Sequence, residues 1–454
     1  DDAPTLTATG ANVTFTENGS AVPLFSGASL STIEAGQTIT SLTFTVGGLV
    51  NGTSEKIIVD GSAITLTNGT GTTTTNGMTY NVTVSGNTAT VELTKVAGVS
   101  TANMTTLING INYQNIGDDL SVGTRTATIT QIVDSGSSTT PNANTTATNI
   151  VSTVTIQPVN DAPVATITAP SYSATEQVNL TLSGTGMAIS DVDALNGNVT
   201  VTLSVGEGII TVAEGTNTVS VSNSGTNSVT LTGTVTEINN LLAGLNSGTI
   251  TYNDPLDAPA SSTTITLLVN DQGNTGSGGA LTNSVARTIN ITAVNDAPVL
   301  TGTVATAYTE NTASIALVSG ATISDIDNVT NFNNGTLTTS FASYVTGDQF
   351  TINNQGIGAG QIGVSGANVT YAGVTIGTFT GGNGSNLVVT FNSSATPAAV
   401  QALVNQLRYA SSSEDPTTGG TANSRAVTVT FNDGSNTGTG GALTSAITGT
   451  LNIT

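Results

Sequence analysis

Acidic side chains recur at matching positions along this chain, and they are the residues best suited to chemistry. They form an early glutamate, a paired acid and a later acidic loop: Glu17, Glu176 and Glu310; Asp191 with Asp193 and Asp325 with Asp327; Asp118 with Asp119, Asp254 with Asp257, and Glu414 with Asp415. Carboxylate oxygens can bind hard cations such as calcium, or act in pairs as acid and base in glycoside hydrolysis. Their recurrence at matching positions favours the first of these uses.

A short motif marks the period on which these acids recur. It reads DDAP at residues 1–4, VNDAPV at residues 159–164 and VNDAPVL at residues 294–300. A period of this size indicates whole domains in tandem, not the short turns of a solenoid. We therefore expect three domains, at residues 1–158, 159–293 and 294–454, and we expect the function to lie at the joints between them.

Composition removes several classes of function. The 454 residues include 28 acids but only 6 Lys and Arg, a net charge of −22, so nucleic acids and anionic membranes are poor partners. There is no Cys, His or Trp, which excludes thiolate or imidazole metal sites and the nucleophiles that depend on them. No apolar run reaches the ~18 residues needed to span a bilayer. Only hard oxygen ligands remain.

The elements that must position these acids are mostly β-strands. Apolar and polar residues alternate with period two at Leu42, Phe44 and Val46, and again through residues 199–205. Late in each unit a strand ends in an acid, and the three strands are: Ala127, Ile129 and Val133 before Asp134; Ile265, Leu267 and Val269 before Asp271; Val427, Val429 and Phe431 before Asp433. A Gly-, Ser- and Asn-rich loop follows each strand and leads to a last strand before the next joint.

One helical pattern interrupts the strands in every unit. Apolar residues fall at i, i+3, i+4 and i+7 in three segments: Met104, Leu107, Ile108 and Ile111; Ile238, Leu241, Leu242 and Leu245; Val400, Leu403, Val404 and Leu407. Thr396 and Pro397 supply an N-cap and first turn for the third. A strand with a tyrosine follows each segment, at Tyr113, Tyr252 and Tyr409. We expect each helix to close one edge or end of a β-sandwich, with the tyrosine in the core.

Strand geometry then predicts where the acids meet. Because a ten-residue strand spans roughly 33 Å, acids one strand apart lie at opposite ends of a sandwich. The two joints should collect these side chains: Glu17, Asp118, Asp119, Asn160, Asp161, Asp191, Asp193 and Asp271 at the first; Glu176, Asp254, Asp257, Asn295, Asp296, Asp325, Asp327 and Asp433 at the second. Crowded carboxylates without Lys or Arg repel one another. Calcium, which takes six to eight oxygens, resolves this better than magnesium does.

The same residues carry a family resemblance that covers the whole chain. The NDAP joint, the early Thr-Glu pair, the DxD and the acid ending the late strand resemble the calcium-ligating set of cadherin repeats. The chain is still more similar to cadherin-like repeats of giant bacterial surface proteins, including RTX-type adhesins, in three segments: LTGTVTEINNLLAGL at residues 231–245, GDQFTINNQGIGAGQIGVSG at 347–366 and VTFNDG at 429–434. Unit one departs from the pattern, with Thr32 and Glu34 where the DxD should be.

The resemblance implies an all-β chain of three tandem cadherin-like or immunoglobulin-like Greek-key β-sandwiches in an elongated rod. It also implies an extracellular location and a calcium-stiffened structural or adhesive array, a stalk or adhesin segment of a bacterial cell-surface protein. The partners would then be flanking repeats or copies of the same protein, and a host or cell-surface ligand.

Two other functions deserve comparison with this one. In the first, the chain is the subunit of a fibre or surface layer, joined head to tail through calcium: Glu310, Glu414 and Asp415 at one end would meet Asp1, Asp2 and Asp134 at the other. In the second it is a glycosidase, the reaction open to paired carboxylates. Aromatic residues make up only 4% of the chain and the acids follow the joints, not one cleft. We therefore expect no enzyme activity.

Overall fold

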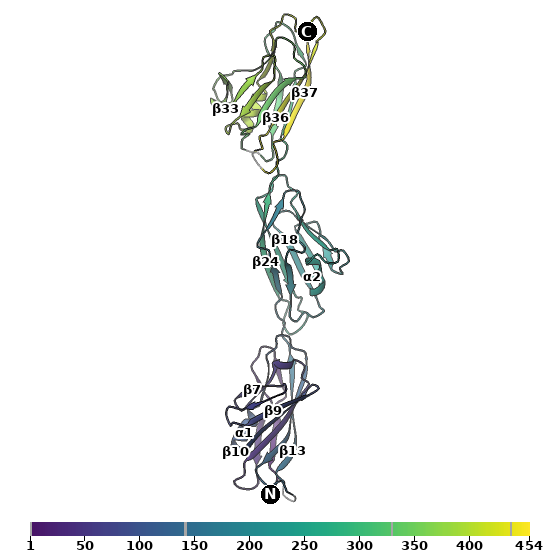
Figure 1. The fold of residues 1–454 in the computed structure, drawn as a ribbon, viewed down its shortest axis with the longest axis vertical. Coiled ribbons are helices and arrows are strands. Elements are labelled where there is room, and N and C mark those ends of the chain that lie inside the picture. The colour runs from purple at the N-terminus through teal and green to yellow at the C-terminus, as the bar shows by residue number, and fades with distance from the viewer. Residues whose placement is uncertain (1, 140–142, 328–329, 436–437) are drawn as a thin grey trace.

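The computed structural model describes residues 2–139, 143–327, 330–435 and 438–454. Three β-sandwiches follow one another along a rod, with the N-terminus at one end and the C-terminus at the other (Figure 1). In the described residues each sandwich has one short α-helix. The expected all-β architecture is thereby confirmed. No helix of the described part is long and apolar enough to cross a membrane.

The first sandwich contains these elements: β1 (Thr5–Gly10), β2 (Val13–Thr16), β3 (Val22–Pro23), β4 (Phe25–Ser31), β5 (Ile39–Gly47), a 3-10 helix η1 (Gly52–Ser54), β6 (Glu55–Val59), β7 (Ser62–Thr65), β8 (Gly69–Thr72), β9 (Thr79–Ser85), β10 (Thr88–Val99), α1 (Thr101–Asn109), β11 (Asn112–Asn115), β12 (Gly123–Asp134) and β13 (Thr145–Gln157). Its sheets run β2-β13-β12-β5-β10-β9-β8 and β3-β11-β6-β7, and β1 pairs with β4.

The second sandwich is smaller. Its elements are β14 (Val164–Ile167), β15 (Tyr172–Thr175), β16 (Leu180–Thr181), β17 (Met187–Ser190), β18 (Asn198–Val205), β19 (Ile209–Ala213), β20 (Ser220–Ser222), β21 (Ser228–Thr234), α2 (Val235–Leu242), β22 (Thr249–Asn253), β23 (Ser262–Asn270) and β24 (Thr282–Thr292). The sheet orders are β15-β24-β23-β18-β21-β20 and β16-β22-β19, with β14 paired to β17.

The third sandwich repeats this plan and adds a hairpin. Its elements are β25 (Val299–Val304), β26 (Ala307–Tyr308), β27 (Ile315–Ala316), β28 (Val318–Ser324), β29 (Thr336–Phe341), β30 (Asp348–Ile352), β31 (Ile362–Ser365), β32 (Asn368–Tyr371), β33 (Val374–Gly381), β34 (Leu387–Phe391), α3 (Pro397–Val404), β35 (Leu407–Ser411), β36 (Ser424–Asn432) and β37 (Thr444–Ile453). The sheets are β26-β37-β36-β29-β34-β33-β32-β31 and β27-β35-β30, and β25 pairs with β28.

One pairing common to all three sandwiches matters for the joints. A short early strand lies parallel to the last strand: β2 on β13, β15 on β24, and β26 on β37. Parallel pairing brings the end of the early strand beside the end of the last one. The early glutamate that follows this strand is therefore carried to the point where the chain leaves the sandwich.

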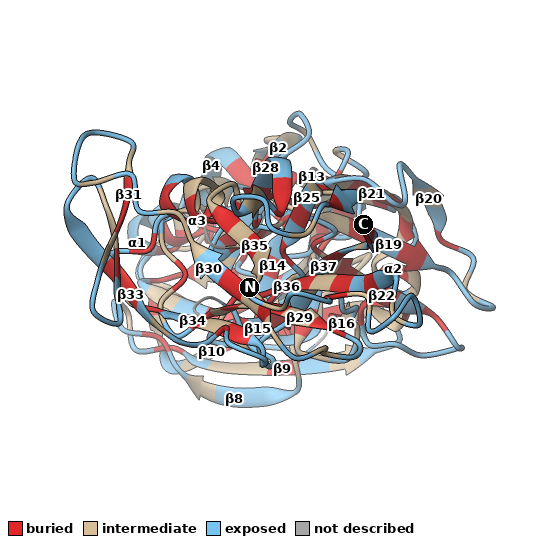
Figure 2. Ribbon diagram, turned by 90° about the horizontal axis from the view of Figure 1, so that it is seen from above, coloured by how far each residue is buried: buried red, intermediate tan, exposed pale blue. Residues whose placement is uncertain are grey.

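The cores follow the alternation predicted from the sequence. Leu42, Phe44 and Val46 are buried, and so are the inward positions predicted on β18 and on the late strands β23 and β36. Seen along the rod, buried residues lie inside the layers and exposed ones on the rim (Figure 2). The late strand β12 differs, because a register shift between Ile129 and Gln131 turns Ile132 inward and leaves Val133 only half-buried. A bulge of this kind cannot be read from period-two alternation.

The third helix begins where expected, and all three helices end before the i+7 residues. Thr396 caps α3, its side chain accepting a hydrogen bond from the backbone of Ala399, and Pro397 is the first helical residue. Ile111 and Leu407 lie beyond their helices and are buried, whereas Leu245 lies beyond α2 and is exposed. The prediction of Leu245 as an inward-facing helix residue was therefore wrong. Tyr113, Tyr252 and Tyr409 are buried, as expected.

Candidate metal centres at the two joints

The glutamate of the first joint is held against the linker by the parallel pair β2–β13. The register Thr16↔Gln157 leads to a hydrogen bond from the Glu17 amide to the Gln157 carbonyl, at 3.0 Å. The Val159 amide then donates to Glu17 Oε2 at 2.8 Å. The other oxygen, Oε1, is buried and has no hydrogen-bond partner among the described residues. One carboxylate oxygen is thus fixed by the linker, and one is available.

The paired acids of the second sandwich approach the same linker from the other side. Asp191 and Asp193 follow β17, which pairs with β14 directly after the linker. The Asp161 amide donates to Asp193 Oδ2 at 3.0 Å, and the Asp193 amide donates to Asp191 Oδ1 at 3.2 Å. Oδ2 atoms of Asp161 and Asp191 are buried without a partner in the described structure. Backbone amides of the linker and of the DxD loop therefore fix the carboxylates of Asp193 and Asp191 beside that of Asp161.

The acid that ends the late strand has a different role. Asp271 is fully buried, and its Oδ1 accepts 2.8 Å hydrogen bonds from the Gly273 and Leu281 amides. Its Oδ2 accepts from Asn160 Nδ2 at 2.7 Å. A carboxylate only accepts, so the amide nitrogen of Asn160 must face Asp271. Asn160 Oδ1 faces away from it and, in the described structure, is buried without a partner.

Burial and like charge act together at the first joint. Desolvation raises the pKa of Glu17, and the nearby charges of Asp161, Asp118 and Asp119 raise it further, against the lowering effect of the Val159 amide. Desolvation and the charges of Asp118 and Asp193 raise the pKa of Asp161. For Asp191, desolvation and its interactions with Asp193 raise the pKa to about 6. Each shift shows that the ionised form lacks a compensating positive charge.

Two hollows divide the acids of the first joint. Glu17, Asp119 and Asp193 line one, together with apolar atoms of Val122 and Leu195. The other is lined by Asp118, Asp161 and Asp191. Each hollow thus combines acids from the first sandwich, or from the linker, with acids of the second. A cation bound in either would contact both sides of the joint.

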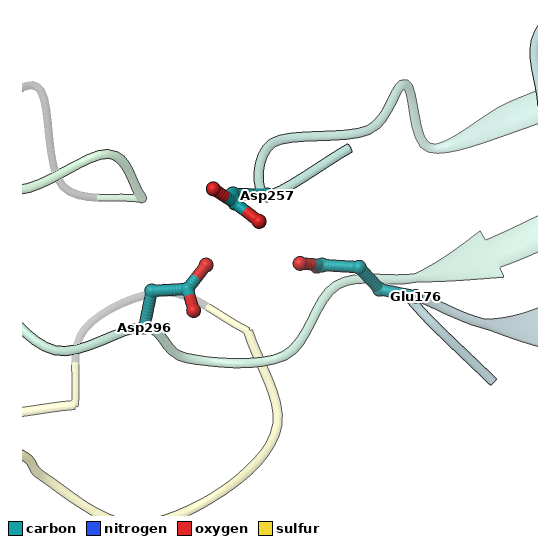
Figure 3. A group of neighbouring side chains, drawn as sticks. All are labelled: Glu176, Asp257 and Asp296. Atoms are coloured by element: carbon teal, nitrogen blue, oxygen red, sulfur yellow. The ribbon is translucent and has the colours of Figure 1, made fainter. Parts of the chain in front are cut away.

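The second joint brings three acids together most closely. One oxygen from each of Glu176, Asp257 and Asp296 lies within 4.8 Å of the others, and the three side chains converge from separate segments (Figure 3). The Val294 amide holds Glu176 Oε2 at 2.8 Å, as Val159 holds Glu17. Gln177 Nε2 donates to Asp257 Oδ1 at 2.6 Å. These hydrogen bonds orient the carboxylates from behind and leave oxygens for the centre.

The remaining residues of the second joint repeat the first. The Asp296 amide donates to Asp327 Oδ2, and the Asp327 amide donates to Asp325 Oδ1. Asn295 Nδ2 donates to the buried Asp433 at 2.8 Å. Desolvation is the largest cause that raises the pKa of Glu176 and of Asp296, and neighbouring acids add to it in both cases. Both joints therefore use one design.

Asp254 is the predicted site residue that the structure does not bring to this group. Its side chain is fully buried, where Oδ2 accepts from the Tyr252 hydroxyl at 3.1 Å and Oδ1 from the Leu256 amide at 3.2 Å. The other two sandwiches place Glu55 and Asp348 beneath Tyr113 and Tyr409, respectively. These two acids were missed from the sequence.

Each of the missed acids has an arginine partner. Arg125 pairs with Glu55, and Arg425 pairs with Asp348 at 2.8 Å, all four side chains being at most 2% exposed. Within the described residues these are the ion pairs, and neither includes a joint acid. A lone arginine in the apolar alternation of a late strand is the signal that could have pointed to a buried acid partner.

The acids at the outer ends of the rod are arranged in part like those of the joints. Glu34 Oε1 accepts from the Asp2 amide at 2.7 Å, as Asp193 does from Asp161. The Glu310 amide donates to the Thr454 carbonyl at 2.7 Å, as Glu17 does to Gln157. Asp415 accepts from the Gly419 amide and the Thr417 hydroxyl, and Glu414 is exposed. Asp1 lies outside the described residues.

Known proteins were compared with this chain in three ways. No protein-family model matches it, and no curated protein sequence matches it. Among solved structures, extracellular cadherin domains 1–5 of protocadherin gamma B2 match with 13% identity and a TM-score of 0.35, over 100% of this chain and 60% of that one. Mouse cadherin-23 EC22-24 matches with 13% identity and a TM-score of 0.33, over 100% and 99%. This chain thus spans about three-fifths of the first structure.

Proposed function

We propose that the chain is a calcium-stiffened structural or adhesive repeat array, located outside the cell and exposed on a bacterial surface. The observation that carries this proposal is the convergence of Glu176, Asp257 and Asp296 at the second joint. Three carboxylates that approach so closely, with raised pKa values at two of them, require a positive charge. The ion pairs of the described residues lie elsewhere, so a bound cation is the natural source.

Calcium fits the donor set better than other common metals. It takes six to eight oxygens in flexible geometry, and it accepts carboxylates and amide oxygens together. We assign the ligands of the first joint as Glu17, Asp118, Asp119, Asp161, Asp191, Asp193 and the amide oxygen of Asn160. Those of the second joint are Glu176, Asp257, Asp296, Asp325, Asp327 and Asn295. Asp271 and Asp433 orient the two asparagines, and Asp254 belongs to the core.

The mechanism of stiffening follows from where the ligands originate. In the first joint, Glu17 belongs to the first sandwich, Asp161 to the linker and Asp193 to the second sandwich. A cation in the hollow lined by Glu17 and Asp193 bonds to both sandwiches and removes the bending freedom of the linker, and it binds only when both sandwiches are folded and correctly oriented. Binding therefore stabilises both the fold and the straight arrangement.

The outer face of the first sandwich supports a related proposal about partners. Glu34 holds the Asp2 amide in the geometry that Asp193 and Asp327 use at the internal joints. This face is suited to receive the end of another unit, either a flanking repeat or a second copy of the chain. Fibre or layer formation through such contacts is the second candidate function.

Calorimetry and small-angle X-ray scattering with calcium and then with a chelator test the main proposal. Calcium should raise the unfolding temperature and lengthen the average end-to-end distance, because it straightens two bending points. Magnesium at the same concentration is the control, and it should do much less because it retains its water shell. Superimposable unfolding curves and scattering profiles in calcium and chelator would refute calcium binding at the joints.

A further inference from the structure

The loop that carries Asp118 and Asp119 is tied at three points to the interior of the first sandwich. The Ile116 amide donates to the Ser54 carbonyl at 3.0 Å, and the Gly117 amide donates to Asn115 Oδ1 at 3.0 Å. The Asp119 carbonyl accepts from Asn51 Nδ2 at 3.2 Å. Both acids are exposed, whereas the next residue, Leu120, is buried in the core, so these bonds act together with that anchor to set the position of the loop.

Asn51 connects this loop to the buried arginine. Its side-chain oxygen accepts from Arg125 Nη2 at 2.9 Å and from Asn115 Nδ2 at 3.2 Å. The backbone amide of Asn51 donates to Glu55 Oε2 at 3.0 Å. Arg125 and Glu55 are ion-paired, and the Tyr113 hydroxyl donates to Glu55 at 2.8 Å. The buried Arg125–Glu55 pair is therefore connected to the acid loop through the side chain of Asn51, which is half-buried.

The third sandwich shows the same connection in another form. Arg425 pairs with Asp348, and its Nη2 donates to the Pro416 carbonyl at 2.7 Å, directly after Glu414 and Asp415. The second sandwich has Thr263 in the corresponding part of its late strand. There, Gln177 donates its backbone amide to the Asp254 carbonyl and its side chain to Asp257. A buried arginine network thus reaches the acid loop in the first and third sandwiches, whereas the exposed Gln177 holds the loop of the second.

We propose that Asn51 is a positioning residue for the calcium site of the first joint, acting on Asp119 and drawing its own orientation from the Arg125–Glu55 pair. The inference rests on the proposed function. Groups that orient metal ligands by hydrogen bonds change metal affinity by about 10- to 100-fold when they are removed. Asn51 itself touches no proposed ligand oxygen; it holds the backbone from which Asp119 extends.

Asn51→Asp is the sharpest test, because it retains the side-chain oxygen that Arg125 and Asn115 contact, removes the donor to Asp119 and adds one negative charge. Calcium titrations of the full chain, followed by hydrogen exchange, report each linker separately through peptides covering residues 157–165 and 292–300. The calcium midpoint at the first linker should rise about tenfold, with the second linker unchanged. The added negative charge alone would lower that midpoint, so a rise cannot come from charge.

Two controls make the result specific. Asn103→Asp makes the same chemical change on α1, where Nδ2 donates to Asn76 Oδ1 at 3.3 Å, and should leave both midpoints unchanged. In an Asp119→Asn background, Asn51→Asp should add little, because the two residues act through one ligand. An unchanged midpoint, or a full shift that persists without Asp119, would overturn the positioning role. If the unaltered chain shows no calcium-dependent protection at either linker, the proposed function itself fails.

Discussion

The buried carboxylates of the sandwich cores and the carboxylates of the joints have the same chemistry but opposite surroundings. In the third core, Asp348 receives hydrogen bonds from Tyr409 and the Val345 amide and pairs with Arg425. At the second joint, Glu176 receives a backbone hydrogen bond from the Val294 amide on one side, and both Glu176 and Asp296 face other acids. The core network is complete within the chain, whereas the joint lacks positive charge.

This difference separates what holds each sandwich together from what holds the sandwiches in line. Removing one member of a buried pair leaves an uncompensated charge, and the cost is large. A joint that draws its counter-charge from solution responds instead to calcium concentration and to pH. The core should therefore be insensitive to both conditions, and the joint sensitive to both.

The largest effect should come from breaking a core pair. Arg425→Met leaves Asp348 buried without its partner, and we expect a loss of about 3–5 kcal/mol in the free energy of unfolding, with or without calcium. Arg287→Met is the matched control, since Arg287 donates to backbone carbonyls at Ala169 and Ile167 and pairs with no acid among the described residues. Denaturant unfolding measures both. Equal losses in the two variants would show that the buried pair carries no special cost.

Removal of calcium should be the next largest effect. A ligand present at 100 times its dissociation constant stabilises the folded state by about 2.7 kcal/mol, and chelation should remove this amount while leaving the sandwiches folded. Calorimetry checks the change in stability, and circular dichroism checks that the β-structure persists. Loss of β-structure on chelation would mean that calcium holds the sandwiches and not merely the joints.

The sequence alone predicted most of the fold, because strands and helices each leave a recognisable pattern of apolar residues or capping residues. Alternation located the late strands, and Thr396 with Pro397 located the start of α3. The register shift in β12 and the exposure of Leu245 were not predictable, because both depend on how neighbouring strands and loops meet in space. Periodicity describes one segment at a time and contains no information about bulges.

For the site, the sequence predicted acids at the joints, but it did not predict which of them keep carboxylate oxygens available for a cation. Asp254 and Asp257 belong to one short acidic loop, yet Asp254 turns into the core beneath Tyr252 and Asp257 turns toward Glu176. Asp271 looks like the other joint acids in the sequence, but its oxygens accept hydrogen bonds from Asn160 and from two backbone amides. That these residues bind calcium stays a prediction.

Single joint acids should produce a smaller, local effect. Asp193→Ala and Asp327→Ala each remove one charged ligand, and calcium affinity at the altered joint should fall about tenfold, which is 1.4 kcal/mol, with the cores intact. Glu34→Ala is the matched control, since Glu34 holds the Asp2 amide at the outer face and touches neither internal joint. Calcium titration by calorimetry measures all three. Equal losses would show that the DxD acids are not the ligands.

The smallest effect is the pH dependence of the folding stability. It also distinguishes the joints from the cores most clearly. Without calcium, burial and Asp193 raise the pKa of Asp191 to about 6 from the ordinary 3.8, and Glu17, Asp161, Glu176 and Asp296 are raised as well. A folded-state pKa above the unfolded one means that the folded protein binds protons more tightly. Stability from these groups is therefore complete below about pH 4 and is lost as the pH rises through about 6.

Saturating calcium should reverse this sign, because a bound cation favours the ionised carboxylates and lowers their folded-state pKa below the unfolded value. Stability would then be present above pH 4 and lost on acidification. Melting temperatures should thus rise in chelator as the pH falls from 7.5 to 5, stay nearly constant in saturating calcium over the same range, and fall in calcium only below about pH 4. Asp191→Asn should reduce the rise in chelator, while Arg287→Met should leave both slopes unchanged, since Arg287 donates to backbone carbonyls. An equal rise in both buffers between pH 7.5 and 5 would contradict cation binding by these acids.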